Sequence, residues 1–332
     1  MITEEDTAFV LGGTYKIPVL VGQYEKTFVQ DQKRDETFNE AAFGREYESK
    51  WSGTVEDAFF NMEAFDRNRV LLRPEVEHSG RSSALSYYIL AVDVGRKGCE
   101  SAVCVLKVTP QSNGRSVKSL VNIYTFSDTH FGIQALKLKK LYYKYKARRL
   151  VIDANGVGLG LIDYMVMPSI DQDTGDEYPD FGVYNDEENY YKQYKTANTE
   201  HEAMYLIKAS APINTEAHAN IQTQLSSGTL KLLIDERTAK SKLLGTTVGT
   251  KMTPEQRAEY LKPFTLTSIL GEEISNLREE TEGINILLKR ANRNIGKDKF
   301  SALEYGLYYI KEEEDKKKKK KKFNAADWCF MN

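Results

Sequence analysis

The chain has few of the residues that bind zinc or form disulfides. Its 332 residues include three cysteines and four histidines, and none of them lies at the spacing of a zinc motif. An odd number of cysteines without paired spacing predicts reduced thiols in a reducing compartment. The composition therefore argues against a disulfide-stabilised secreted protein and against a zinc module.

Long apolar runs are also absent. No stretch reaches the roughly 18 consecutive apolar residues that a transmembrane helix needs, and the first six residues lack the basic and apolar regions of a signal peptide. With 41% hydrophobic residues, the chain has enough apolar side chains for the core of one large domain or two ordinary ones. We expect a globular protein without a membrane partner that acts in a cytoplasm, its own or a host's.

Net charge is low, at −2, but it is unevenly distributed because residues 316–322 are seven consecutive lysines. Removing these seven positive charges from −2 leaves −9 on the rest of the chain, which argues against a protein that coats DNA. Two interpretations of the run stay open. In the first, the lysines bind nucleic acid or an acidic partner. In the second, the run is a solubilising tail whose lysines pair with the acidic residues 312–315 along a helix.

The first 80 residues have irregular patterning. A short apolar strand is expected at residues 17–21 and an amphipathic helix within residues 38–51, and residues 75–86 read as a linker or loop. From Tyr87 the pattern changes to strands at 87–94, 102–108 and 117–126 with short connections, which predicts an antiparallel meander.

A helix at 133–147 followed by a strand at 150–153 predicts a crossover to parallel pairing, so the sheet is mixed and covered by helices. Further along, we expect a helix from about 158 to 167, a strand at 181–184, a helical region over 199–226 and a strand at 229–233. Residues 239–262 have weak periodicity and are interpreted as a mobile loop. A last helix is expected at 299–310, with Asp298 at its N-terminal end.

Three aspartates occupy unusual positions in this pattern. Asp93 ends an apolar strand, and an unpaired carboxylate there would cost several kcal/mol that a divalent cation would offset. Asp153 ends the strand at 150–153, and parallel pairing of the two strands would bring both carboxylates to the same sheet edge. Asp298 would join them from the last helix. Two Mg²⁺ or Mn²⁺ ions need such converging hard oxygen ligands.

Each aspartate also has an ordinary explanation. Asp298 is well placed to be an N-cap, and Asp153 to hydrogen-bond within the turn that follows it. The glycines at 156, 158 and 160 do not match a dinucleotide-binding motif, so we interpret them as allowing the loop to pass close to Asp153 and to a phosphate backbone. No P-loop motif is present.

Basic residues flank the acidic ones, as expected for a site that holds a polyanion over metal ions. They are either DNA-binding residues or surface charges that balance their neighbours. The candidates are Arg96, Lys97, Arg290, Arg293, Lys297 and Lys299.

Several segments together resemble the C-terminal nuclease domain of the large terminase subunit of tailed bacteriophages. The resemblance covers most of the chain from about Phe38 onward. Its most specific segments are F-G-R-E-Y-E-S at 43–49 with E-D-A-F-F at 56–60, A-V-D-V-G at 91–95, V-I-D-A-N-G-V-G at 151–158 and K-D-K-F-S-A-L at 297–303. The last three look like the acidic motifs of that family.

The resemblance implies an α/β fold of ribonuclease H-like type, with a mixed five-stranded sheet flanked by helices. It implies an endodeoxyribonuclease that cuts concatemeric double-stranded viral DNA during genome packaging, in the host cytoplasm, at the procapsid and not in the mature virion. Residues 1–80 would be the end of a motor domain or a linker, 81–312 the nuclease domain and 313–332 a charged, lysine-rich tail. Expected partners are the portal protein, the small terminase subunit and a terminase ATPase domain.

In that family two metal ions activate water for in-line attack. The resemblance therefore implies that Asp93 bridges both ions, that Asp153 and Asp298 each complete one, and that Lys297 holds the scissile phosphate. The chain departs from a complete large terminase in lacking a P-loop, so no ATPase activity is expected from it alone. Alternatives are a Holliday-junction-resolvase-like nuclease, an actin-like or sugar-kinase-like phosphotransferase, and a non-catalytic DNA-binding or docking module of a packaging motor.

Overall fold

The fold is described from a computed structural model of the chain. It describes residues 14–25, 27–33, 58–80, 85–95, 100–112, 115–127 and 129–327. Contacts divide the chain into two units, residues 1–56 and 57–332. Within the described residues, no helix is long and apolar enough to cross a membrane.

The described part of the first unit is helical. It contains α1 (Lys16–Leu20) and α2 (Phe28–Lys33), and the ring of Tyr24 stacks on that of Phe28 with centroids 4.4 Å apart. The strand predicted at residues 17–21 is therefore wrong. Pro18 lies in the first turn of α1, where its missing N–H is not needed for an intrahelical hydrogen bond. The helix predicted within residues 38–51 lies outside the described residues.

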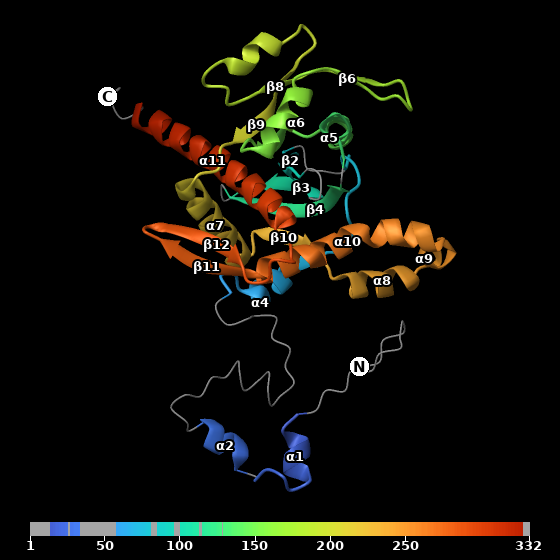
Figure 1. Ribbon diagram of the computed structural model, residues 1–332, viewed down its shortest axis with the longest axis vertical. Coiled ribbons are helices and arrows are strands. Elements are labelled where there is room, and N and C mark those ends of the chain that lie inside the picture. The colour runs from blue at the N-terminus through green and yellow to red at the C-terminus, as the bar shows by residue number, and fades with distance from the viewer. Residues whose placement is uncertain are drawn as a thin grey trace. The chain divides into compact units, whose positions relative to one another are not determined.

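The second unit is built on a mixed sheet of eight strands (Figure 1). In spatial order the strands are β1 (Arg69–Leu71), β10 (Leu230–Leu233), β4 (Ser116–Ser127), β3 (Glu100–Pro110), β2 (Tyr87–Asp93), β5 (Arg149–Asp153), β9 (Glu200–Ile207) and β8 (Phe181–Val183). Strands β2, β3 and β4 form the predicted antiparallel meander, and β5 pairs parallel to β2 after a helical crossover. This central arrangement confirms the ribonuclease H-like α/β fold.

The resemblance implies five strands and the sequence pattern six, whereas the sheet has eight, because β1 and β9 were not recognised as strands. Residues 200–207 were predicted as part of a helix, and this prediction is wrong. Glutamate and alanine favour helix in isolation, but β9 pairs with β5 on one side and β8 on the other, and this pairing outweighs the local preference. Strand β1 lies within residues 1–80, which were expected to be the end of a motor domain or a linker.

A layer of helices covers each face of the sheet. Successive side chains of β2 point to opposite faces, and both sets are apolar and need to be covered. Ile89 and Ala91 face one apolar cluster, together with α4 (Met62–Arg67), α7 (Ala211–Ser226), α10 (Pro254–Ser275) and α11 (Asp298–Asp327). Tyr88, Leu90 and Val92 face the other, together with α5 (Phe131–Tyr145) and α6 (Val157–Met165). A strand buried on both faces reads as an apolar run, which is the pattern seen before Asp93.

Residues 236–275 are helical, so the mobile loop predicted at 239–262 is wrong. The segment contains α8 (Glu236–Leu244), α9 (Thr247–Lys251) and α10, and these helices extend to one side of the sheet in Figure 1. A capping box joins Thr253 and Gln256 at the start of α10. Few side chains are buried between residues 239 and 262, so the periodicity of this stretch is weak, and the informative local signals are the caps.

The remaining elements lie at the periphery of the sheet. They are the short pair β6 (Ser169–Ile170) and β7 (Glu177–Tyr178), the 3₁₀ helix η1 (Tyr190–Tyr194), and the hairpin of β11 (Leu277–Glu282) and β12 (Asn285–Arg290). The hairpin was not anticipated from the sequence.

The second unit begins before the boundary expected at residue 81. Helix α4 packs in the core, and β1 pairs with β10. Asn68 joins these parts, because its amide donates to the carbonyl oxygens of Ala64 and Leu225, each at 2.7 Å. At the other end, α11 continues as one helix through residue 327, across the boundary expected at 313.

Helix α11 lies very close to the sheet at Gly306. A Cβ atom there would come within 2.7 Å of Leu106 Cδ1 and 2.8 Å of Ala91 Cβ. These distances are shorter than real Cβ contacts, so a larger residue would force the helix and sheet apart.

We therefore predict that Gly306→Leu lowers the free energy of unfolding by about 3 kcal/mol or more, because overpacking strains the helix–sheet interface. Thermal unfolding followed by circular dichroism would measure the change. Gly245→Leu is the matched control, since Gly245 is exposed and has φ −72°. An equal loss in both variants would contradict the packing explanation.

Candidate functional site

The two strand-end aspartates lie at the same edge of the sheet. Asp93 is the last residue of β2 and Asp153 the last of β5, and these parallel strands pair with Val92 opposite Ile152. Asp298 is the first residue of α11, which packs across β2 and β3. The expectation that the strands are parallel neighbours is confirmed, and the structure brings all three carboxylates into one electrostatic environment.

The pKa values of these groups reflect that environment. Burial, together with the negative charges of Asp298 and Asp153, raises the pKa of Asp93 to about 7, although Lys297 and a hydrogen bond with Ser301 oppose the rise. Burial also raises the pKa values of Asp153 and Asp298. Buried like charges destabilise one another unless a cation neutralises them. The negative charges of the three carboxylates are therefore not fully balanced by the surrounding residues.

The donor chemistry of the three aspartates fits a hard divalent cation, since Mg²⁺ and Mn²⁺ prefer carboxylate oxygens. Among the described residues, however, no three Asp, Glu, His or Cys side chains lie close enough to hold one ion. Repulsion between unneutralised carboxylates favours such a separation. The role of the aspartates as metal ligands stays a prediction.

The loop after Asp153 passes close to that residue, as we interpreted from its glycines. A Cβ atom at Gly158 would lie 1.7 Å from the carbonyl oxygen of Asp153, so no other residue fits without moving the backbone. The backbone N–H of Asn155 donates to Asp153 Oδ1 at 3.0 Å. The predicted turn contact of Asp153 is present, and it leaves the other carboxylate oxygen for a further partner.

The start of α11 is held in place by buried charges. Lys299 Nζ donates to Glu100 Oε2 at 2.7 Å and to Glu273 Oε1 at 3.2 Å. Glu273 also accepts the backbone N–H of Phe300 at 2.9 Å, which satisfies one of the free donors at the helix N-terminus. These contacts fix the first turn of α11 and, with it, Asp298.

Lys299 is not placed to bind DNA, which corrects its assignment as a DNA-binding residue. Its side chain is only 5% exposed and is paired with the two glutamates. The sequence showed a lysine beside an aspartate but not its direction, because Glu100 and Glu273 come from β3 and α10. Glu273 itself was missed, since no local pattern marks a partner 26 residues away.

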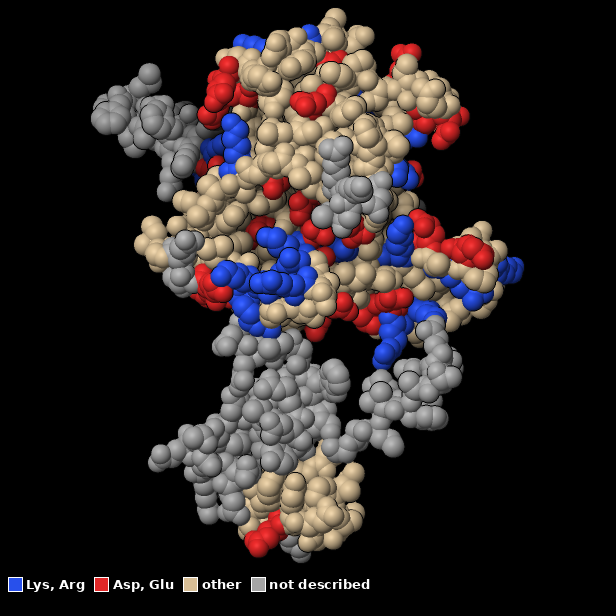
Figure 2. All heavy atoms as spheres, viewed as in Figure 1, with Lys and Arg blue, Asp and Glu red and all other residues tan. Residues whose placement is uncertain are grey.

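The other basic candidates differ in position. Lys297, Arg290 and Arg293 are exposed, and Figure 2 shows Lys and Arg atoms gathered over the base of the β11–β12 hairpin and the loop before α11, with acidic atoms in the hollow beside them. Arg290 also donates to the carbonyl oxygen of Arg293 at 3.2 Å, which shapes this loop. Arg96 and Lys97 lie outside the described residues.

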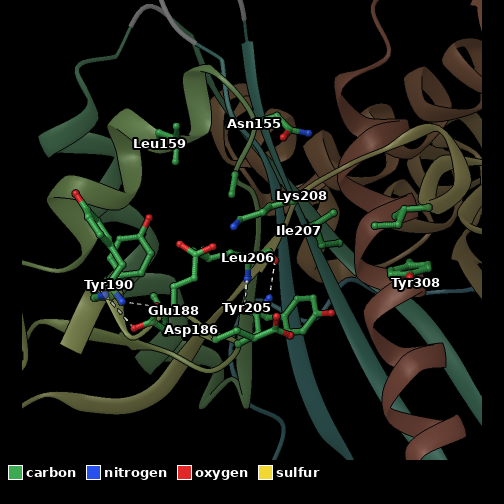
Figure 3. Close-up of a pocket in the computed structure, with 16 residues that line it drawn as sticks. Asn155, Leu159, Asp186, Glu188, Tyr190, Tyr205, Leu206, Ile207, Lys208 and Tyr308 are labelled. Atoms are coloured by element: carbon green, nitrogen blue, oxygen red, sulfur yellow. Dashed lines mark hydrogen bonds between the residues drawn. The ribbon is translucent and has the colours of Figure 1, made fainter.

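A cavity of about 640 Å³ adjoins the loop after Asp153 (Figure 3). Asn155 and Leu159 line it from one side, and Glu188 and Lys208 point into it from opposite sides. Lys208 directly follows β9, where Asp153 pairs with Ile207, and its side chain points into the cavity. Lys208 was missed, because recognising it required reading residues 200–207 as a strand.

A second cavity, of about 230 Å³, lies on the hairpin side of the site. It is lined by residues of α7, β12 and α11, among them Lys297, Ser301 and Tyr305. His218 Nδ1 pairs with Glu304 at the cavity wall. Burial raises the pKa of Glu304, and the imidazole opposes this rise. This pair ties α7 to α11 one and a half turns after Asp298.

We predict that Glu273→Ala lowers the free energy of unfolding by about 3 kcal/mol, because it removes one partner of a buried ion pair and the acceptor of the Phe300 N–H. Glu273→Gln keeps that acceptor and the packing, so its effect should be smaller. Chemical denaturation would measure both variants. Equal stabilities of Ala, Gln and wild type would show that Glu273 does not anchor α11.

Comparisons with known proteins complete the description. No family model matches the chain, and no curated protein matches it. Similar solved structures include the large terminase nuclease from thermophilic phage G20c with bound cobalt, at a TM-score of 0.43 and 13% identity, over 76% of this chain and 97% of that one. The Thermus phage P74-26 large terminase nuclease domain has a TM-score of 0.41 and 12% identity, over 76% and 94%. The HK97 bacteriophage large terminase has a TM-score of 0.41 and 8% identity, over 88% and 52%. Each of these three similar structures is a large terminase or its nuclease domain.

Proposed function

We propose that this chain is a metal-dependent endonuclease that cuts double-stranded DNA, and that it serves as the nuclease of a viral genome-packaging motor. The observation that carries the proposal is the position of Asp93. A buried carboxylate at a strand end, with its pKa raised to about 7 beside Asp153 and Asp298, is costly for stability and is characteristic of functional sites. The acidic motifs at residues 91–95, 151–158 and 297–303 support the packaging role.

Asp93, Asp153 and Asp298 would hold two Mg²⁺ or Mn²⁺ ions, with Asp93 shared between them. When bound, such ions supply a polarised water and stabilise negative charge on the leaving oxygen. The chain itself contributes the rest of the site. Ser301 holds the Asp93 carboxylate through its hydrogen bond, and the buried contacts of Glu273 fix the helix turn that carries Asp298.

Binding of DNA would rest on the exposed cations around the acidic edge. Lys297 lowers the pKa values of Asp93 and Asp153, so its ammonium group lies within electrostatic reach of both and is placed to hold the phosphate being cut. Arg290 and Arg293 extend the positive surface along the hairpin side. Lys208 adds a cation on the cavity side. These groups would contact the phosphate backbone of the DNA and not its bases, so cutting should show little base preference.

The assembly context follows from the same proposal. The partners would be a terminase ATPase domain, the small terminase subunit and a portal protein, and the nuclease would act on concatemeric DNA in the host cytoplasm. ATP hydrolysis would be supplied by another polypeptide or domain.

We predict that Asp93→Asn abolishes metal-dependent cleavage, with a loss of at least about 100-fold, or about 2.7 kcal/mol of activation free energy. Supercoiled plasmid incubated with Mg²⁺, Mn²⁺ or a chelator would report nicking and linearisation. The variant should remain folded, because it removes a buried charge and keeps the side-chain volume. Asp173→Asn, in the exposed turn between β6 and β7, is the matched control. Full activity of Asp93→Asn would refute the assignment.

We predict that Lys297→Met weakens binding of duplex DNA and reduces the slope of log K against log salt by about 0.9, because each neutralised phosphate releases counterions. Lys208→Met should act in the same direction. Fluorescence anisotropy in chelator, between about 50 and 200 mM salt, would measure the slopes. Lys251→Met, at the end of α9, is the control, and an equal change in all three variants would contradict specific contacts.

A further inference from the structure

A second group of cations lies away from the acidic edge and is not used by the proposed site. Arg148 and Arg149 lie at the opposite end of β5 from Asp153, and Lys316 and Lys317 lie in the later turns of α11. We call these four residues the tyrosine–cation surface, since two tyrosine rings hold them. Figure 1 shows α11 running from the middle of the sheet to its outer side, where these lysines lie.

Each ring holds two cations from different parts of the chain. Arg149 Cζ lies 4.5 Å and Lys316 Nζ 5.7 Å from the centroid of the Tyr184 ring. Arg148 Cζ lies 5.0 Å and Lys317 Nζ 6.0 Å from the centroid of the Tyr87 ring. Aromatic faces attract cations, but here they bring like charges from β5 and α11 together. The four cations are therefore held in place before any partner binds.

The neighbouring acids neutralise this surface only in part. Arg149 pairs with Glu202 at 3.1 Å and Lys316 with Glu313 at 3.2 Å. Arg148 and Lys317 form no ion pair with any described residue. The surface therefore carries a surplus of positive charge.

Three other acids of α11 lie near this surface. Glu314 turns toward Lys118 and Ser116 of the sheet, and Asp315 pairs with Lys311 and Lys318. Glu312 lies near the ring of Tyr205 and forms no ion pair with a described residue. Part of the pairing expected for a solubilising tail is thus present, through Glu313 and Asp315.

We propose that the tyrosine–cation surface binds the phosphate backbone of double-stranded DNA outside the cutting site. The identity of the nucleic acid rests on the proposed function. Arginine and lysine are the main phosphate-binding side chains, and cations already held on rings lose little conformational freedom on binding.

An acidic protein is the less favoured occupant. Stable protein interfaces have an apolar or aromatic centre surrounded by a polar rim. Here the rings of Tyr87 and Tyr184 are covered by the cations, and neither ring belongs to the exposed large apolar side chains of the described residues. The surface offers charge without an apolar anchor, and this suits a phosphate backbone.

The distance between this surface and the cutting site sets the length of DNA needed. Lys316 is 18 residues after Asp298 on one helix, which corresponds to about 27 Å at 1.5 Å per residue. At about 3.4 Å per base pair, a duplex must extend at least about 8 base pairs beyond the scissile phosphate to reach it. A shorter duplex could contact the acidic edge or the tyrosine–cation surface, but not both at once.

The test measures binding of the full chain to duplex DNA by fluorescence anisotropy in chelator, so that no cleavage is required. We expect the double variant Arg148→Gln/Lys317→Gln to bind a 30-base-pair duplex, about 100 Å long, at least about fivefold more weakly. Its slope of log K against log salt should fall by about 1.8. Neither residue forms an ion pair, so the melting temperature should be retained.

The double variant Lys251→Gln/Lys262→Gln is the control, because it removes the same charge from exposed positions of α9 and α10. An unchanged affinity and slope of Arg148→Gln/Lys317→Gln on the long duplex would overturn the proposal. Loss of binding to a poly-glutamate peptide without loss of duplex binding would also overturn it, in favour of an acidic protein. The nuclease proposal is tested separately by plasmid cleavage with Asp93→Asn, so each can fail alone.

Discussion

The close packing of α11 on β2 and β3 is the constraint on which the functional arrangement depends. At Gly306 the helix lies so near the sheet that no Cβ atom fits. Because α11 is straight and continuous, this contact sets the position of both its ends. The first turn, held by the Lys299–Glu273 contact, places Asp298 beside the strand-end carboxylates, and the later turns place Lys316 over the ring of Tyr184. One helix thus connects an acidic edge with a basic surface.

Acidic and basic side chains gather at two different places in the second unit, and holding like charges together costs free energy. Burial and mutual repulsion raise the pKa of Asp93, which means that the fold holds its carboxylate in an unfavourable environment. At the other end of β5, tyrosine rings hold Arg148 and Arg149 near lysines of α11. Ligands of opposite charge would reduce the repulsion within each group. A divalent cation suits the first and a phosphate backbone suits the second.

Much of the central sheet could be predicted, because strands buried on both faces are recognisable as apolar runs between turns. Strands β2 to β5, the crossover helix and the start of the last helix were all identified. The errors have particular causes. Strand β9 is rich in helix-favouring residues and is decided by pairing on both sides, and residues 239–262 bury too few side chains to show strong periodicity. The hairpin of β11 and β12 contains charged residues on both strands and has no strong strand signal.

The sequence by itself determined the mixed α/β sheet and the places of Asp93, Asp153 and Asp298 at strand ends and a helix start, because apolar periodicity and turn residues act locally. Only the tertiary structure decided which neighbouring charges face this site. Lys299 turns inward because Glu273 lies on a helix far along the chain, and Lys208 reaches the cavity beside the loop after Asp153 because β9 pairs with β5. Side-chain direction depends on contacts between distant segments, and no local pattern contains that information.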